Sequence, residues 1–293
     1  MRRSGAVNRV IERCGASAGR VGGVDSAPLP LDVNHKKAHP ARAYDYYLGG
    51  KDNFESDRHL ARRTEEVWPT VRVFARENRE FMRRAVHYLA AEEGVSQYLD
   101  IGSGIPTAPN VHEIAQREVP SSRVVYVDND PLVISHARSL LRSGPEGKAG
   151  YLYADVRQPD EIIAGASEVL DFSRPVALLL IAVLHFMANE WDPQAIIGDL
   201  LCALPAGSFL AASQITDEHD PVTVHAAADI YRKATGVPAQ ARPADVFEEL
   251  AFTSQGLSII EPGVVLVSEW RDQPRHRPSA AHVSCYGAVG RKP

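Results

Sequence analysis

The sequence QYLDIGSGIPTAPNVHEIAQRE at residues 97–118 predicts a short buried strand, a glycine turn and a helix. Gly102 and Gly104 permit backbone φ angles that side chains disfavour, and they let a ligand approach the backbone closely. Thr107 is placed to cap the helix, in which apolar residues recur at helical spacing from Val111 onward. A strand, a glycine turn and a helix N-terminus together form a typical site for a nucleotide-containing cofactor. The stretch therefore predicts an α/β fold with a cofactor at this turn.

Two further strands are predicted to end in acids. Residues 123–128 form an apolar run that ends in Asp128, and an acid at the tip of the second strand can accept hydrogen bonds from both hydroxyls of a ribose. Residues 150–155 form a third strand that ends in Asp155. Its carboxylate can accept from an adenine amino group, and the N–H of Val156 can donate to an adenine ring nitrogen. Asp155 could instead cap a helix or a turn, but Asp128 and the glycine turn favour the cofactor role.

The order of the remaining elements predicts a mostly parallel sheet. From residue 97 onward predicted strands alternate with helices, which is the pattern of crossover connections between parallel strands. Residues 175–184 are a continuous apolar run, as expected of a central strand buried on both faces. The strands predicted at 257–268 and 284–290 have no long helix between them. We therefore expect antiparallel pairing at one edge of the sheet.

The segment YDYYLGGKDNF at residues 44–54 has two interpretations. It could be an aromatic helical hairpin that only packs on the core. It could instead be a lid over a cofactor pocket, contributing Tyr44, Tyr47 and Asn53. The long helix predicted at residues 71–91 carries several arginines, of which Arg79 could meet an anionic group near the pocket.

Length and composition favour one large α/β domain with a helical appendage. The chain has 293 residues, which we divide into a flexible tail (1–34), a helical cap (35–93) and a Rossmann-like domain (94–293). A net charge of −5 and a pI near 6.1 give no overall attraction to nucleic acid. The three cysteines have no metal-ligand spacing, so no metal is expected. The longest apolar run is too short to span a membrane, and we expect a cytoplasmic enzyme.

His185 follows the apolar run at the expected mouth of the pocket. It could be a general base, because an imidazole titrates near neutral pH, or it could be a histidine in the pocket wall. The sequence has no Gly-x-Ser-x-Gly nucleophile elbow, no His-Glu-x-x-His and no kinase motifs. It also lacks an Asn/Asp-Pro-Pro-aromatic motif after the fourth strand, which argues against methylation of amino groups on nucleic-acid bases.

Several motifs resemble one enzyme family. DIGSGIPT at residues 100–107 and VDNDP at 127–131 resemble the first two motifs of class I S-adenosylmethionine-dependent methyltransferases. The segment YDYYLGGKDNF, with ENR at 77–79 and EPGVV at 261–265, is similar to an actinobacterial family of these enzymes whose substrates are largely unassigned. The resemblance covers the chain from about residue 38 onward.

This resemblance implies a Rossmann-like class I methyltransferase fold, with a seven-stranded, mostly parallel sheet, an antiparallel C-terminal strand and an N-terminal helical cap. It implies S-adenosylmethionine as the cofactor, with Gly102, Ser103 and Gly104 around the methionine part. Asp128 would hold the ribose and Asp155 the adenine. The other residues expected to contact the cofactor are Tyr44, Tyr47, Asn53, Arg79, Asp100, Thr107, Asn129, Val156 and Ala182. His185 and Tyr47 are the expected catalytic residues.

The sequence thus predicts a methyltransferase that transfers a methyl group to oxygen or nitrogen of a small molecule by in-line displacement. Two other functions stay open, namely a regulatory module that binds S-adenosylmethionine without catalysis and a nicotinamide-dependent oxidoreductase. Thr107 weakens the second, because the dinucleotide motif has its third glycine at that position. We expect neither nucleic acid nor membrane as a partner, and a homodimer stays open.

Overall fold

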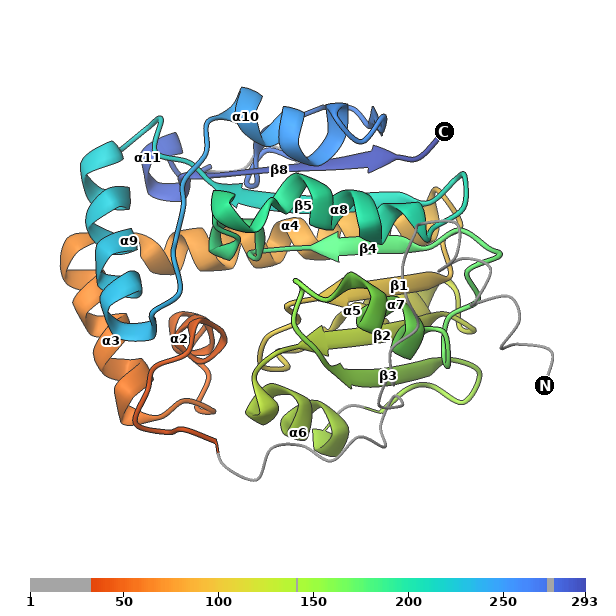
Figure 1. Cartoon of the computed structure of the whole chain (residues 1–293), viewed down its shortest axis with the longest axis horizontal. Coiled ribbons are helices and arrows are strands. Elements are labelled where there is room, and N and C mark those ends of the chain that lie inside the picture. Colours follow the sequence, from red (N-terminus) through yellow and green to blue (C-terminus); the bar gives the residue numbers. More distant parts are fainter. Residues whose placement is uncertain (1–32, 141, 273–276) are drawn as a thin grey trace.

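The computed structural model describes residues 33–140, 142–272 and 277–293 (Figure 1). The tail predicted at residues 1–34 therefore lies almost wholly outside the described residues. In the described part, no helix is both long enough and apolar enough to cross a membrane.

A single mixed sheet forms the centre of the described structure, in the order β3-β2-β1-β4-β5-β8-β6. Strands β1 to β5 are parallel, and β8 runs antiparallel beside β5. Both β6 and β7 pair with the outer edge of β8, so they share the last position of the sheet. The predicted fold, a mostly parallel sheet that ends in antiparallel strands, is confirmed. The strands are β1 (Gln97–Ile101), β2 (Arg123–Asp128), β3 (Lys148–Tyr153), β4 (Ala177–Leu180), β5 (Phe209–Ile215), β6 (Ser258–Ile259), β7 (Val265–Leu266) and β8 (Cys285–Arg291).

Helices cover both faces of this sheet, because successive side chains of each strand point to opposite faces and both faces are apolar. In β1, Tyr98 packs toward α4, α5 and α6, whereas Leu99 packs toward α7 and α8. The covering helices are α4 (Val71–Ala91), α5 (Val111–Glu118), α6 (Pro131–Leu140), α7 (Pro159–Ala166) and α8 (Pro193–Cys202). Shorter helices, α10 (Ala244–Glu248), η3 (Glu249–Thr253) and α11 (Ala280–Val283), lie near β8.

Two local predictions are wrong. The apolar run at 175–184 forms a strand only over β4, because Ala182 has a left-handed φ of 58° and its N–H donates to Oγ of Ser213. Thr107 does not cap α5. The helix begins at Val111, and its N-cap is Asn110, whose N–H donates to the Glu113 carboxylate over 2.6 Å. Asn110 lies directly before the helix and has Glu113 three positions later, so it is a better cap than Thr107.

A cap covers the carboxyl ends of the parallel strands and consists of three helices, α2 (Pro40–Tyr47), α3 (Glu55–Val67) and α9 (Pro221–Thr235). Figure 1 shows β1 to β4 pointing toward the side where these helices lie. The first two were expected from the sequence. Helix α9 was not expected there, since it follows β5, but it packs along α3.

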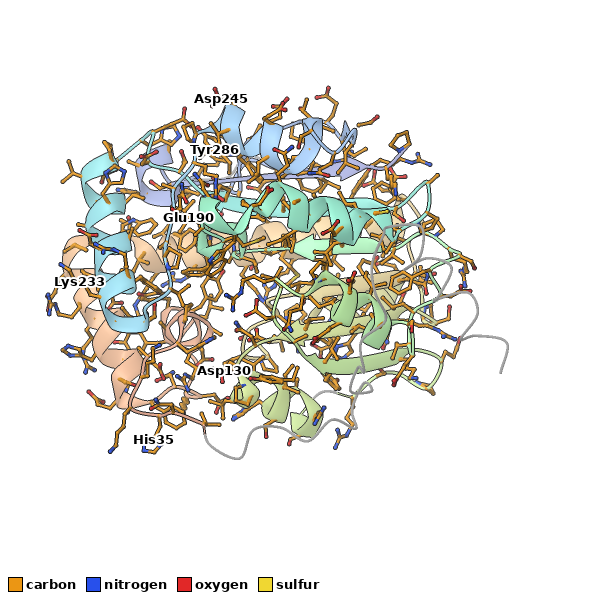
Figure 2. The ribbon with its side chains drawn as sticks, in the orientation of Figure 1. His35, Asp130, Glu190, Lys233, Asp245 and Tyr286 are labelled. Atoms are coloured by element: carbon orange, nitrogen blue, oxygen red, sulfur yellow. The ribbon has the colours of Figure 1, made fainter. Side chains whose placement is uncertain are left out.

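A buried ionic cluster joins the cap to the sheet. Nε of Arg42 in α2 lies 3.2 Å from Asp57 of α3 and 3.5 Å from Asp130, which follows β2. Asp57 is 0% exposed and Asp130 is 3% exposed. Figure 2 shows Asp130 at the junction between the cap and the sheet. The guanidinium therefore neutralises acids from both parts of the fold.

Candidate functional site

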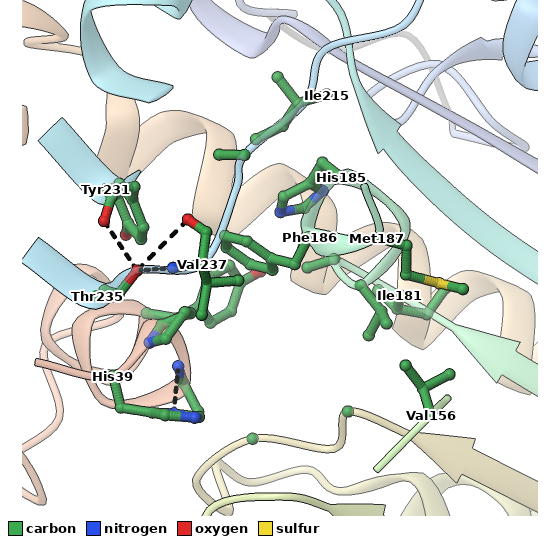
Figure 3. A pocket seen from close by; sticks show the side chains of 18 of the residues that line it. His39, Val156, Ile181, His185, Phe186, Met187, Ile215, Tyr231, Thr235 and Val237 are labelled. Atoms are coloured by element: carbon green, nitrogen blue, oxygen red, sulfur yellow. Dashed lines mark hydrogen bonds between the residues drawn. The ribbon is translucent and has the colours of Figure 1, made fainter. Parts of the chain in front are cut away.

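A cavity of about 440 Å³ lies between the carboxyl ends of the strands and the cap (Figure 3). Its walls come from the ends of β1 to β5, from the cap helices, from α4, and from the short helix η1 (Leu184–Phe186). This is the place where open α/β sheets bind their ligands.

The glycine turn after β1 forms one wall of this cavity. Gly102 and Gly104 both have positive φ, 70° and 66°. A Cβ on Gly102 would lie 2.3 Å from a methyl carbon of Val183, so this glycine permits close packing against the loop after β4. A Cβ on Gly104 would meet no atom within 4 Å. Gly104 thus keeps the turn in shape while leaving space beside it for a ligand.

Asp128 fixes this turn from the neighbouring strand. It is 4% exposed, and its two carboxylate oxygens accept hydrogen bonds from the N–H groups of Gly104 and Asp130, both over 2.9 Å. Burial raises its pKa above the usual value, while His39 and these two N–H groups oppose the rise. Each oxygen keeps a further lone pair, so the side chain can still accept two hydrogen bonds from a diol.

Asp100 and Arg79 carry opposite charges, and each has a hydrogen-bonding atom without a partner among the described residues. The carboxylate of Asp100 lines the cavity and accepts no hydrogen bond from any described residue. Burial, and to a lesser extent Asp128, raise its pKa to about 7 against the opposing charge of Arg79. Arg79 donates through Nη2 to the carbonyls of Thr107 and Pro109, whereas its buried Nε has no partner among the described residues. Such a pair suits a zwitterionic amino acid.

Asp155 is already engaged by a residue that the sequence analysis missed. Arg157 grips its carboxylate with two hydrogen bonds, 2.9 and 2.7 Å long, which lowers the pKa of Asp155. The Arg157 guanidinium also lies 4.6 Å from the ring centre of Trp191. An adenine amino group would thus share the carboxylate with Arg157. The N–H of Val156 has no acceptor in the described structure and stays available.

His185 lies at 2% exposure in the cavity wall, between the rings of Phe74 and Phe186. Neither ring nitrogen has a hydrogen-bond partner in the described part of the chain. Burial, assisted by the charge of Arg242, lowers the pKa of His185 to about 3. The imidazole is therefore neutral at physiological pH, and the pocket-wall interpretation of this residue describes the structure better than a free general base does.

Arg242, another residue missed from the sequence, holds the His185 loop in place. Its guanidinium is 3% exposed and donates to the carbonyls of Leu184 and Met187, over 2.9 and 2.7 Å. It also donates to the side chains of Gln214 and Asn189. A lone arginine far along the sequence gives no signal of this role, because its acceptors lie far from it in the sequence and half of them are backbone oxygens.

Tyr44 and Tyr47 of α2 both line the cavity with protonated hydroxyls. Tyr44 donates to the carbonyl of Ala75 over 2.8 Å and accepts from Asn78. The hydroxyl of Tyr231 donates to that of Tyr47 over 3.2 Å. Burial raises the pKa of each α2 tyrosine to about 12. Tyr47 is therefore no ready base in this structure.

All but two of the residues expected at the site line the cavity. Asn53 lies outside because its amide donates to Asp45 and to the carbonyl of Gly50, over 2.8 and 3.1 Å, and so closes the turn between α2 and α3. Thr107 lies outside because its carbonyl is held by Arg79. The expected residues that do line the cavity are Tyr44, Tyr47, Arg79, Asp100, Gly102, Ser103, Gly104, Asp128, Asn129, Asp155, Val156, Ala182 and His185.

Comparisons with known proteins show which chains this one is similar to. A family model described as S-adenosyl methyltransferase matches residues 26–293. The crystal structure of a DUF574 family protein from Streptomyces avermitilis is 43% identical, with a TM-score of 0.82, over 89% of this chain and 100% of that one. A candidate methyltransferase from Thermobifida fusca is 38% identical, with a TM-score of 0.81, over 90% and 98% of the two chains. No curated protein matches the chain.

Proposed function

Because the chain belongs to the S-adenosyl methyltransferase family, we propose that it transfers the methyl group of S-adenosylmethionine to oxygen or nitrogen of a small-molecule acceptor. The observation that carries this proposal is the presence of Asp100 and Arg79, two opposite charges, in one cavity with an open glycine turn. The bound cofactor supplies a methyl carbon activated by its positively charged sulfur, and a lone pair of the acceptor attacks this carbon and displaces the sulfur.

The residues of the cavity fit this cofactor. Asp100 would accept from its ammonium group, and Arg79 would meet its carboxylate through Nε. Gly104 leaves room beside the backbone, and Asp128 has lone pairs for the ribose hydroxyls. The Val156 N–H would donate to the adenine ring.

A nicotinamide dinucleotide fits less well. In that class of protein the N–H groups at the start of the first crossover helix bind the pyrophosphate. In α5 this position is taken by the chain's own acid, since Glu113 accepts from the N–H and the amide of Asn110. A second negative group at that helix end would be repelled.

The chain's own residues would act mainly by positioning the acceptor and excluding water. The cap helices α2, α3 and α9 would close the acceptor side of the cavity as a lid. His185 is neutral, so a ring nitrogen can accept a hydrogen bond from an acceptor hydroxyl and orient it.

The test is calorimetric titration of the protein with S-adenosylmethionine, S-adenosylhomocysteine and NADH. We expect the first two to bind and NADH to give no saturable heat. Gly102→Arg should abolish binding, because a side chain there overlaps Val183, and circular dichroism would show whether the variant is folded. Binding of NADH alone would overturn the proposal. Binding of S-adenosylmethionine with no product from any acceptor would favour the regulatory alternative.

Binding of S-adenosylhomocysteine at pH 7 is expected to release protons from Asp100. With a pKa of about 7 the carboxyl is about half protonated in the free protein, and an adjacent ammonium would drive it to the ionised form. Affinity should therefore rise between pH 6 and about 7.5, until the ligand's own amino group, with an ordinary pKa near 8, begins to lose its charge. Calorimetry in two buffers of different ionisation enthalpy measures the proton release.

Asp100→Asn is the matched variant for this experiment. It should remove most of the proton release and weaken binding. It should also raise the melting temperature of the free protein at pH 8. The folded-state pKa of about 7 lies above the ordinary aspartate pKa of 3.8, so the ionised carboxylate destabilises the fold increasingly from about pH 4 to 7. Equal heats in both buffers for the unsubstituted protein would contradict the assignment of Asp100.

A further inference from the structure

Six rings form a continuous wall on the cap side of the cavity. Trp68 stacks on Phe74 at 5.3 Å, and Phe74 meets His185 edge-on at 6.4 Å. His185 then contacts Phe186 at 4.4 Å, and Phe186 contacts Tyr231 at 5.9 Å. The hydroxyl of Tyr231 bonds to that of Tyr47. Figure 3 shows His185, Phe186 and Tyr231 grouped on this wall. We call the space they line the aromatic chamber.

The aromatic chamber contains no charge. His185 is neutral, and burial keeps the hydroxyls of Tyr47 and Tyr231 protonated by raising their pKa values. The charged side chains that line the cavity belong to its other parts, such as the strand ends, or are exposed, as Lys37 is. An ion placed in the chamber would lose its hydration, and the nearby guanidinium of Arg242 already donates to four oxygens, so burial of the ion costs several kcal/mol. The chamber therefore selects an uncharged ligand.

Two features of the wall indicate the ligand's shape and its polar group. Rings at these separations leave flat faces and edges exposed to the cavity, and aromatic partners prefer stacked and edge-on contacts with such surfaces. The single polar group without a partner in this wall is the imidazole of His185, since the hydroxyls of Tyr47 and Tyr231 bond to each other. A neutral imidazole offers one donor and one acceptor, which a hydroxyl matches.

His185 lies on the loop that packs against the glycine turn. Val183, two residues before it, is the side chain that packs against Gly102. Both residues belong to the loop that Arg242 holds. A ligand hydroxyl bound to His185 would thus be held by the same loop that borders the turn assigned to the methionine part of the cofactor.

We propose that the aromatic chamber is the acceptor subsite and takes an uncharged, planar aromatic molecule whose hydroxyl hydrogen-bonds to His185. This inference rests on the proposed function. In the transfer, a bond forms between the acceptor oxygen and the methyl carbon as the bond from that carbon to sulfur breaks, the neutral imidazole of His185 orients the acceptor hydroxyl through a hydrogen bond, and the hydroxyl proton is released to solvent.

The experiment measures binding of small probes to the full chain saturated with S-adenosylhomocysteine. The probes are 2-naphthol, its saturated analogue decahydro-2-naphthol, and 2-naphthoate, which is planar but charged. We expect 2-naphthol to bind with saturable heat, and the other two to bind at least tenfold more weakly. Equal binding of either analogue, or no binding of 2-naphthol, would overturn the inference.

Substitutions locate the probe. His185→Phe keeps a ring of similar size but removes both nitrogens, and should weaken 2-naphthol binding about tenfold, the value of one hydrogen bond. Phe186→Ala removes a wall and should weaken it as well. His225→Phe is the control, since that histidine is 65% exposed and pairs with Asp217 outside the chamber. Unchanged affinity in both chamber variants would contradict the assignment.

The titration with S-adenosylhomocysteine separates the two proposals. If the unsubstituted protein does not bind it, the proposed function fails, and the acceptor assignment fails with it. If it binds but the three naphthyl probes are not distinguished, only the acceptor assignment fails. Retained S-adenosylhomocysteine affinity in the His185→Phe and Phe186→Ala variants shows that they are folded.

Discussion

Alanine in place of Asp128 is expected to weaken S-adenosylmethionine binding by about two to four orders of magnitude. Two hydrogen bonds from ribose hydroxyls to a carboxylate contribute roughly 1.5–3 kcal/mol each, and about 1.4 kcal/mol corresponds to a factor of ten. The substitution also frees the N–H of Gly104, which Asp128 holds over 2.9 Å, so the glycine turn loses its support. The measurement is calorimetric titration at pH 7.5.

Folding should suffer much less from this substitution. Burial already raises the pKa of Asp128, so removing the carboxylate relieves a desolvation cost that offsets the two lost backbone contacts. The matched control is Asp155→Ala, whose carboxylate is already bonded twice by Arg157. We expect a smaller loss of affinity there. Unchanged affinity in Asp128→Ala, with the fold intact, would exclude the ribose assignment.

Methionine in place of Arg42 is expected to lower the free energy of unfolding by about 3–5 kcal/mol, because breaking a buried ion pair leaves its partner charge unpaired. Asp57 and Asp130, at 0% and 3% exposure, would both lose the guanidinium that lies between them. Methionine keeps most of the side-chain length, so the decrease in the free energy of unfolding reflects the lost charge more than the lost volume. Urea unfolding monitored by circular dichroism gives the value.

Arg62→Met is the control for this experiment. Arg62 lies 2.5 Å from Glu55, but the two side chains are 48% and 70% exposed. Exposed pairs contribute about 0–1 kcal/mol because water and salt screen them. A similar loss in both variants would show that burial of the Arg42 cluster does not decide its strength. A loss below about 1 kcal/mol in Arg42→Met would contradict the expected role.

The glycine turn and the first three strands follow from local sequence. The apolar runs before Gly102 and Asp128 are short, and each ends at a residue that is typical of a strand end. An apolar run of this kind is enough to predict a buried parallel strand. Parallel neighbours also bring their carboxyl ends to one edge, which is why the sequence predicts the glycine turn, Asp128 and Asp155 at one site. The family motifs added the cofactor, which the family model supports.

Side-chain partners were harder to predict, because they depend on groups far apart in the sequence. Arg242 lies 58 residues from the carbonyl of Leu184 that it holds, and no periodic pattern marks such a contact. The same distance hides the neutral state of His185, whose pKa reflects burial under the cap and the charge of Arg242. Helix α9 has the pattern of an ordinary amphipathic helix, and only its packing on α3 makes it part of the cap.

The sequence by itself determined the α/β class, the glycine turn and the acids beside it, since these depend on backbone preferences and on apolar periodicity within a few residues. The tertiary structure alone decided which of these polar groups are still free to bind a ligand. Asp100 has no hydrogen-bond partner in the described structure, whereas Asp155 is held by Arg157 and Asn53 by Asp45. A hydrogen bond or a pKa depends on what surrounds a group in space, and the chain places those neighbours only when it folds.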